Sequence, residues 1–201
     1  MKIHQLKTPI TDEDILKIKV GEYINITGEI IFARDEAHKK ALKLYKKNKE
    51  IPFDYDGGVL YHVGPIALNE KGIWKIIAAG PTTSVRMEMF EPEFIQHFNI
   101  KIILGKGGMS GETINTFKEY KSIYGTITGG TALIWAKKIK NVIKVDWLEL
   151  GIPEALWQVN VKDFGPILVT IDSYGNNLYE DVQKNVYNNK EKVFEFLDID
   201  G

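Results

Sequence analysis

The chain has 201 residues, of which 44% are hydrophobic, enough for one domain of ordinary size with an apolar core. Its 26 basic and 27 acidic residues leave a net charge of −1, so no overall field favours nucleic acid or an anionic membrane. Cysteine is absent, which excludes disulfides, thiol nucleophiles and thiolate ligands from this chain. No apolar stretch approaches the length of a membrane span, and the first residues lack the apolar segment of a secretory signal. We therefore expect a cytoplasmic protein.

Hydrophobic periodicity and turn residues predict strands and helices along most of the chain. The expected strands are residues 23–32, 59–63, 73–79, 101–104, 123–128, 142–148, 156–161 and 167–172. The expected helices are a short one capped by Thr11, then 36–49, 92–98, 111–120, 132–139 and 179–187. The lysines of the second helix could suit nucleic acid, but a solvated helix face is the simpler interpretation. We predict a single domain over 1–201, ending in a polar tail at 188–201.

The expected strands 73–79, 101–104 and 123–128 are predicted to be buried, and each leads into a glycine-rich turn. Each turn opens a segment that is predicted to be helical. Unpaired N–H groups at a helix start carry the positive end of the helix dipole, so such turns are natural anion sites. The sequence therefore predicts a pocket for a small anion on an α/β scaffold. The turns are Gly80-Pro81-Thr82-Thr83, Gly105-Lys106-Gly107-Gly108 and Thr128-Gly129-Gly130-Thr131.

The turn around Lys106 invites comparison with nucleotide-binding loops. Its lysine precedes the later glycines, and no Gly-Lys-Ser/Thr triplet closes the turn, which argues against a P-loop. The last glycine gap is one residue too long for the dinucleotide-binding motif. A tight turn that needs positive-φ glycines explains the glycines but leaves the embedded lysine unexplained. We therefore interpret Lys106 as a candidate anion ligand.

The turn that begins at Gly80 carries three consecutive hydroxyls before Arg86. One hydroxyl can be an N-cap, but three exceed what capping needs. A carboxylate can accept N–H bonds from such a turn and a two-pronged contact from an arginine. The pair Arg34-Asp35 at the end of an earlier strand is either a surface ion pair or part of the same site.

The histidines are less informative. His38, four residues after Arg34, can share its helical face or be solvated. His62 has apolar neighbours, and a core or interface role is at least as compatible with them as a catalytic one. No grouping of His, Asp and Glu has metal-ligand spacing, so we predict no metal site in this chain.

Four ordered motifs resemble one family. They are residues 33–38 (ARDEAH), 56–65 (DGGVLYHVGP), 80–87 (GPTTSVRM) and 105–109 (GKGGM). They resemble the β subunit of class I fumarate hydratase, and the closely similar β subunit of L(+)-tartrate dehydratase carries the same signatures. Residues 149–157 and 161–164 look like a later segment of that family, and the resemblance covers about residues 10–185. One departure is Glu88, where an aspartate is more usual.

This resemblance implies a swivelling β/β/α domain, with a mixed sheet and flanking helices. It implies a hydro-lyase that hydrates fumarate to (S)-malate, or one that acts on L(+)-tartrate. In the family, three cysteines of the α subunit or N-terminal domain hold a [4Fe-4S] cluster, which fits a β chain without cysteine. The expected partners are such an α subunit, as an α2β2 heterotetramer, and a C4 dicarboxylate. A regulatory module that only binds small anions is the alternative from another class.

We predict substrate binding by Arg34, Arg86, Gly105 and Gly107, and catalysis by Thr82, Lys106 and Asp35. A C4 dicarboxylate carries about two negative charges at neutral pH, which cationic side chains and turn N–H groups would offset. By resemblance, Thr82 is the candidate base. An unperturbed hydroxyl is a poor base and needs nearby positive charge, which Lys106 and Arg86 can provide. Asp35 is the second candidate acid–base group, or else the residue that orients Arg34.

Overall fold

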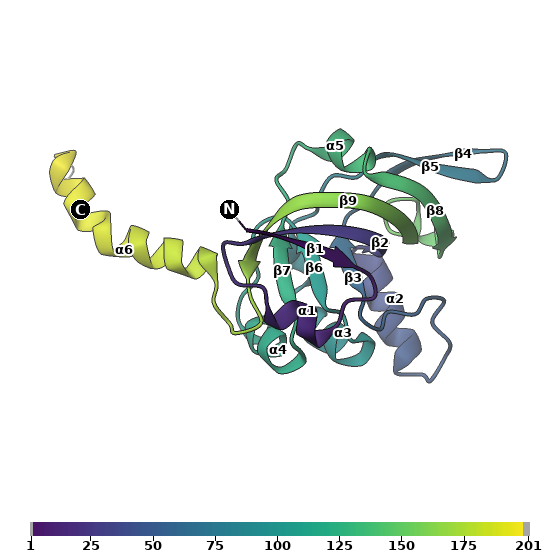
Figure 1. The fold of residues 1–201 in the computed structure, drawn as a ribbon, viewed down its shortest axis with the longest axis horizontal. Helices are drawn as coiled ribbons and strands as arrows, with labels where there is room; N and C mark the ends of the chain where they lie inside the picture. The colour runs from purple at the N-terminus through teal and green to yellow at the C-terminus, as the bar shows by residue number, and fades with distance from the viewer. Residues whose placement is uncertain (1, 199–201) are drawn as a thin grey trace.

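The computed structural model describes residues 2–198 (Figure 1). Its strands are β1 (Ile3–Lys7), β2 (Tyr23–Ala33), β3 (Val59–His62), β4 (Ile66–Glu70), β5 (Ile73–Ala78), β6 (Ile102–Gly105), β7 (Ile123–Thr126), β8 (Ile139–Asp146) and β9 (Leu156–Ile171). The helices are α1 (Asp12–Leu16), α2 (Asp35–Tyr45), α3 (Glu91–Phe98), α4 (Glu112–Tyr120), α5 (Ala132–Ala136) and α6 (Leu178–Phe196), with short 3₁₀ helices η1 (Ser84–Met87) and η2 (Leu148–Leu150).

Seven strands form one mixed sheet in the order β1-β2-β3-β6-β7-β9-β8. The strands from β1 to β7 in this order are parallel, whereas β9 is antiparallel to its neighbours. An additional pairing of β2 with β9 closes β2, β3, β6, β7 and β9 into a ring. The expected α/β architecture, a mixed sheet with flanking helices, is confirmed.

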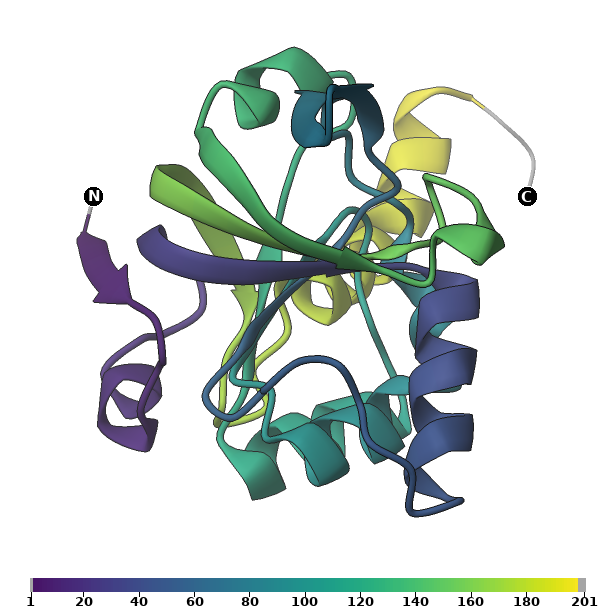
Figure 2. The ribbon, with the colours of Figure 1, turned by 90° about the vertical axis from the view of Figure 1, so that its right-hand side faces the viewer.

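Strands of the ring are buried on both faces, because alternate side chains enter two different cores. Along β2, Ile30 and Phe32 belong to a core inside the ring, whereas Ile31 and Ala33 belong to a core shared with α2, α3 and α4. Figure 2 shows α3 and α4 below the strands, and α5 with the β4–β5 hairpin above them. Residues of β3 alternate in the same way, so the side chain of His62 lies on the face that the helices cover.

Two predictions about strands are wrong, one about where a strand ends and one about how deeply a strand is buried. The expected strands 156–161 and 167–172 are one continuous strand, β9. Pro166 lies at an irregularity of the β2–β9 register, where the missing proline N–H interrupts no regular ladder. The predicted buried strand 73–79 is only partly buried, since β5 pairs only with β4 in a separate hairpin and Ile73 is 75% exposed.

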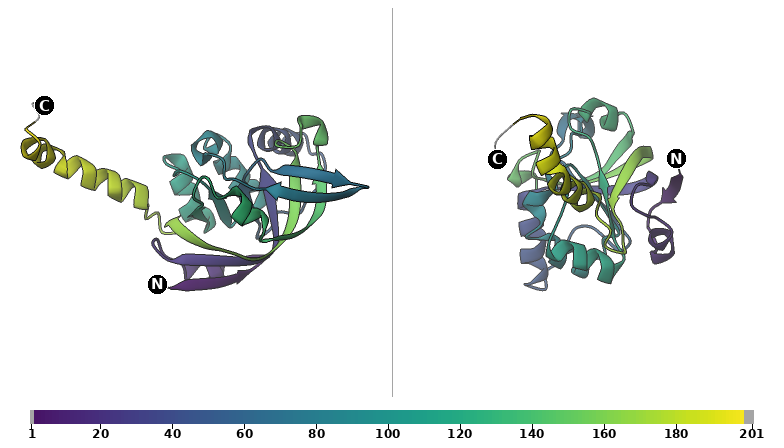
Figure 3. Two further views of the ribbon diagram at one scale, coloured as in Figure 1. Left: turned by 90° about the horizontal axis from the view of Figure 1, so that it is seen from above. Right: turned by 90° about the vertical axis from the view of Figure 1, so that its left-hand side faces the viewer.

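The C-terminal prediction is wrong in part. Residues 188–196, expected as polar tail, continue the helix α6, and residues 199–201 lie outside the described residues. Lysine and glutamate are good helix formers, so a polar composition does not by itself argue against a helix. The helix projects away from the rest of the molecule (Figure 1, Figure 3). Among residues 2–198, no helix combines the length and the apolar character that crossing a bilayer needs.

Candidate functional site

Parallel strands deliver two of the predicted site residues to one edge of the sheet. β2, β3 and β6 are parallel neighbours, so their carboxyl ends lie at the same edge. Arg34 directly follows β2, and Lys106 directly follows β6. Ligands of α/β proteins bind preferentially outside the carboxyl ends of such strands. The sheet topology thus places both cations where a ligand site is expected.

Backbone hydrogen bonds attach the Thr82 turn to this edge. The Thr82 N–H donates to the His62 carbonyl at the end of β3 over 2.7 Å. The Lys106 N–H donates to the Thr82 carbonyl over 3.1 Å, and the Ser84 N–H donates to the Lys106 carbonyl over 3.0 Å. Thr82 and Lys106 therefore lie on adjacent segments of backbone. The same bonds correct the sequence-based expectation, because these three turn N–H groups are not free to bind an anion.

Asp35 lies between the two predicted arginines. Its Oδ2 is 2.6 Å from Arg86 Nη2 and 3.9 Å from Arg34 Nε. Burial opposes ionisation of Asp35, but a backbone hydrogen bond and the Arg86 guanidinium outweigh it, and the pKa of the carboxyl lies below its usual value. Asp35 is thus a carboxylate at neutral pH, which favours the orienting role over proton donation. Side-chain exposures of 24% for Arg34, 26% for Asp35 and 46% for Arg86 leave the group accessible to a ligand.

Glu154 is a fourth member of this group that sequence reasoning missed. Its Oε1 is 3.3 Å from Arg34 Nη2, and its Oε2 accepts the Glu36 N–H over 3.1 Å. Gly64 adds close packing, because a Cβ there would lie only 2.5 Å from Arg34 Nη1. Glu154 stands 118 residues after Glu36 in the chain, so no local pattern indicates that the two meet.

The two glycines predicted to bind substrate differ in setting. Gly105 is buried at the end of β6, and a Cβ there would overlap the Ser84 hydroxyl, so packing alone requires a glycine. Gly107 is exposed and has φ +74°, as expected for the turn. α4 begins at Glu112, within one residue of the predicted start at 111, so several residues separate this turn from the helix. The dipole of α4 therefore does not act at Gly107.

Beneath Arg34 lies a cluster that the sequence did not reveal: His38 from α2, His62 from β3 and Glu91 from α3, all with 0% exposure. Glu91 Oε1 is 2.7 Å from His62 Nε2 and 3.1 Å from His38 Nε2. His38 is therefore not solvated, and His62 occupies the core, as one of the two interpretations held. Glu91 reads in the sequence as an ordinary acidic residue at a helix start.

Burial and the neighbouring charges decide how the cluster ionises. Burial lowers the pKa of His62, although the Glu91 charge opposes this shift. Burial would raise the pKa of Glu91, but His62 and His38 outweigh it and hold the carboxyl ionised. At neutral pH, Glu91 is thus a carboxylate and His62 is a neutral imidazole.

The cluster also has the composition of a metal site. One ligand atom from each of His38, His62 and Glu91 lies within 4.8 Å of the others, a donor set that suits zinc or another transition metal. The three residues are far apart in the sequence, so their spacing did not indicate this grouping, and the absence of a metal site stays a prediction. The hydrogen-bond distance between Glu91 and His62 nevertheless gives both atoms a partner without an ion.

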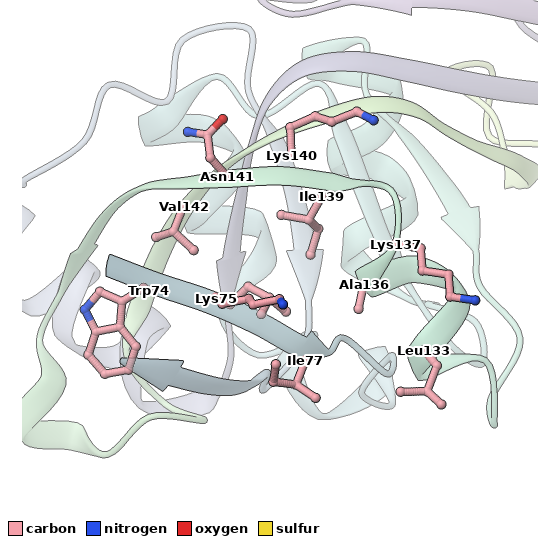
Figure 4. A pocket seen from close by; sticks show the side chains of 11 residues that line it. Trp74, Lys75, Ile77, Leu133, Ala136, Lys137, Ile139, Lys140, Asn141 and Val142 are labelled. Carbon is pink, nitrogen blue, oxygen red and sulfur yellow. The ribbon is translucent and has the colours of Figure 1, made fainter. Parts of the chain in front are cut away.

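A hollow of about 440 Å³, whose lining includes Lys75, Lys137 and Lys140, contains none of the residues described above. It is formed by β5, α5 and β8, and its lining is mainly apolar (Figure 4). Trp74, Leu133 and Val142 line it, but none of the predicted site residues does. The predicted site and this hollow are therefore separate features of the molecule.

The structure is thus an α/β domain with cationic side chains and a hydroxyl-rich turn at the carboxyl edge of its sheet. A sequence model described as Fumarase C-terminus matches residues 1–182, and the chain belongs to this family. This membership confirms the family that the four motifs predicted.

Named relatives cover nearly the whole chain. A Methanocaldococcus jannaschii protein provisionally named L(+)-tartrate dehydratase subunit beta is 44% identical, over 94% of this chain and 96% of its own length. The L(+)-tartrate dehydratase subunit beta of Escherichia coli is 38% identical over 94% of this chain and 93% of its own. A Geobacillus stearothermophilus protein provisionally named fumarate hydratase class I is 41% identical over 97% of this chain, but over only 36% of its own length. The chain is thus similar both to separate subunits and to part of a longer protein.

Proposed function

We propose that this chain is the β subunit of a hydro-lyase that reversibly hydrates fumarate to (S)-malate, at a site shared with an α subunit. The observation that carries the proposal is the accessible group of Arg34, Arg86, Lys106 and Thr82 at the carboxyl edge of the sheet. Membership of the Fumarase C-terminus family and the names of the relatives support it.

The arginines bind the substrate in this proposal. A C4 dicarboxylate brings about two negative charges, and each carboxylate matches the planar fork of a guanidinium. Asp35 and Glu154 hold Arg34 and Arg86 in place before the substrate arrives, so less conformational freedom is lost on binding. Arg34 and Arg86 then orient the carbon that loses its proton.

Thr82 and Lys106 carry the proton chemistry in this proposal. The Thr82 hydroxyl takes the proton from the carbon beside a carboxylate. Lys106, whose backbone N–H donates to the Thr82 carbonyl, supplies the positive charge that favours the ionised hydroxyl. The same ammonium stabilises the charge that develops on the substrate as this proton leaves. Asp35 orients Arg34 and Arg86 instead of donating a proton.

The cofactor is proposed to belong to the partner. A [4Fe-4S] cluster needs thiolate ligands, and this chain has no cysteine, so its residues do not fit the cluster. The histidines and Glu91 of the buried cluster do not fit it either, since they have 0% exposure. We therefore place the cluster on a cysteine-bearing α subunit in an α2β2 assembly.

L(+)-tartrate is the second candidate substrate, and a specific observation favours it. The relatives that match this chain over nearly their whole length, at 44% and 38% identity, carry the tartrate dehydratase name. The two substrates differ by hydroxyl groups, whose contacts can come from either subunit. The common proposal is therefore a hydro-lyase of C4 dicarboxylates.

The test is co-expression with an α subunit and assay of the complex on fumarate, (S)-malate and L-tartrate. We expect turnover by the complex and none by either chain alone. Thr82→Val should abolish turnover while Thr82→Ser keeps part of it, and Thr83→Val is the matched control on the neighbouring hydroxyl. Turnover by the isolated chain, or full activity of Thr82→Val, would overturn the proposal. Dicarboxylate binding without any turnover would support the anion-binding module.

A further inference from the structure

We propose that His38, His62 and Glu91 form a buried triad of positioning residues that fixes the two halves of the proposed site relative to one another. One half is Arg34-Asp35, and the other is the Thr82 turn with Lys106. This inference rests on the proposed function for its catalytic consequence, but its structural part can be tested separately.

The first connection runs from the triad to Arg34. His38 Nδ1 is 2.7 Å from the Arg34 carbonyl, which can only accept a hydrogen bond, so Nδ1 carries a proton. The same carbonyl accepts the His38 backbone N–H over 3.0 Å. Arg34 is the extended residue that precedes α2 and has no side-chain cap. His38 therefore fixes the backbone from which the Arg34 and Asp35 side chains leave.

The second connection runs from the triad to the Thr82 turn. His62 Nδ1 is 2.9 Å from the Ser84 hydroxyl, which also accepts a bond from Tyr124 over 2.8 Å. The His62 carbonyl accepts the Thr82 N–H, and the Ser84 N–H reaches Lys106. One histidine thus holds the turn through both its side chain and its main chain.

The protons of this network form a consistent set. Tyr124 donates to Ser84, Ser84 donates to His62 Nδ1, and His62 Nε2–H donates to Glu91. His38 Nε2 lies 3.1 Å from the same carboxylate oxygen. Glu91 Oε1 therefore contacts both histidines. Loss of its charge should disturb both connections at once, although it lies on neither half of the site.

The surroundings make the network rigid. The His38 ring packs against Phe94 with ring centroids 4.6 Å apart and stacks on Phe90 at 6.0 Å. Across the triad, α2, α3 and β3 each supply one member, and β7 supplies Tyr124. The charge of Asp35 also acts on His62 and favours its protonated form, but less than that of Glu91. A buried and paired charge has few alternative partners, so its geometry is well defined.

The kinetic test uses the holoenzyme complex with Glu91→Gln, a change that removes the charge and keeps the shape. We expect kcat/KM to fall about 10- to 100-fold, mainly through a higher KM for the dicarboxylate, because hydrogen bonds to charged groups are lost. The control is Ser122→Ala, which removes a buried hydrogen bond to the Ile100 carbonyl far from the triad. It should lower stability and leave KM unchanged. Unchanged kinetics in folded Glu91→Gln would overturn the inference.

The structural test uses the isolated full chain and nuclear magnetic resonance. In the wild type, imidazole nitrogen signals should show a proton on Nδ1 of His38 and a proton on Nε2 of His62. Glu91→Gln should shift the amide signals of both Arg34-Asp35 and Thr82–Ser84, whereas Ser122→Ala should not. A metal ion held by the triad, found by elemental analysis of the purified chain, or unshifted amide signals would overturn the inference. If Glu91→Gln shifts these amide signals but the wild-type complex has no activity on the three substrates, the proposed function alone is overturned.

Discussion

Two groups of charged and titratable residues meet at Arg34, whose side chain belongs to one group and whose carbonyl accepts a hydrogen bond from the other. The two groups differ in their access to water. The outer group, Arg34, Asp35, Arg86 and Glu154, has side-chain exposures of 20–46%. The inner group, His38, His62 and Glu91, has 0% exposure throughout. Both groups pair carboxylates with nitrogen-containing side chains, arginines in the outer group and histidines in the inner group, and they differ in burial.

The difference in burial separates binding from positioning. Exposed ion pairs are worth about 0–1 kcal/mol, so the outer arginines can exchange a protein carboxylate for a substrate carboxylate at little cost. Removing one partner of a buried pair costs about 3–5 kcal/mol, because the other charge is left without a partner. The inner group therefore keeps one arrangement, while the outer group remains available to a ligand.

The largest effect on stability should come from the inner group. Glu91→Ala leaves both buried histidines without their carboxylate partner and opens a cavity, so we expect a loss of about 3–5 kcal/mol in the free energy of unfolding. Urea denaturation followed by circular dichroism measures it. Asp35→Ala in the outer group is the comparison and should cost less than about 1 kcal/mol. Equal losses for the two variants would contradict the distinction.

The largest effect on turnover should come from the outer group. Arg86→Ala and Lys106→Ala should each lower kcat/KM of the complex by about 10²–10³-fold, because each removes a cation that stabilises developing charge. The free energy of unfolding of both variants should lie within about 1 kcal/mol of the wild-type value, since the side chains are partly exposed. Steady-state kinetics and urea denaturation of the same preparations provide both measurements. Full activity in either variant would show that its cation lies outside the site.

The loss of stability at low pH should come mainly from the inner group. Burial lowers the pKa of His62 from 6.5, so below that pH the unfolded chain binds a proton that the folded chain does not. Stability should therefore fall with decreasing pH, by up to about 1.4 kcal/mol per pH unit for this one proton. Glu91, whose folded pKa lies below its usual value, acts in the same direction at lower pH. Urea midpoints at pH 7, 6 and 5 test this, and an equal slope in His62→Gln would contradict it.

The smallest effect should come from Glu154. Glu154→Gln keeps an acceptor for the Glu36 N–H but removes the charge beside Arg34. We expect a change in stability below about 1 kcal/mol and a KM only a few-fold higher. A loss of kcat with unchanged KM would assign Glu154 a role beyond holding Arg34.

The sequence was most informative where motifs lie at strand ends. The runs around Arg34, Gly80 and Lys106 predicted the strand ends and an anion site, and the parallel sheet brings Arg34 and Lys106 to one edge. Patterns failed where pairing partners decide the outcome. The apolar run 73–79 is the same whether the strand enters the main sheet or a hairpin, so it could not predict the partial exposure of β5.

The sequence by itself determined the family, the candidate ligands and the absence of thiolates, because these depend on residue identity and short-range order. The tertiary structure alone decided that His38, His62 and Glu91 meet. They come from α2, β3 and α3, and no spacing rule relates residues on different elements. The tertiary structure also decided that Glu154 pairs with Arg34 and that α6 projects away from the rest of the molecule. Burial and pairing are properties of the folded chain, because both depend on which distant surfaces pack together.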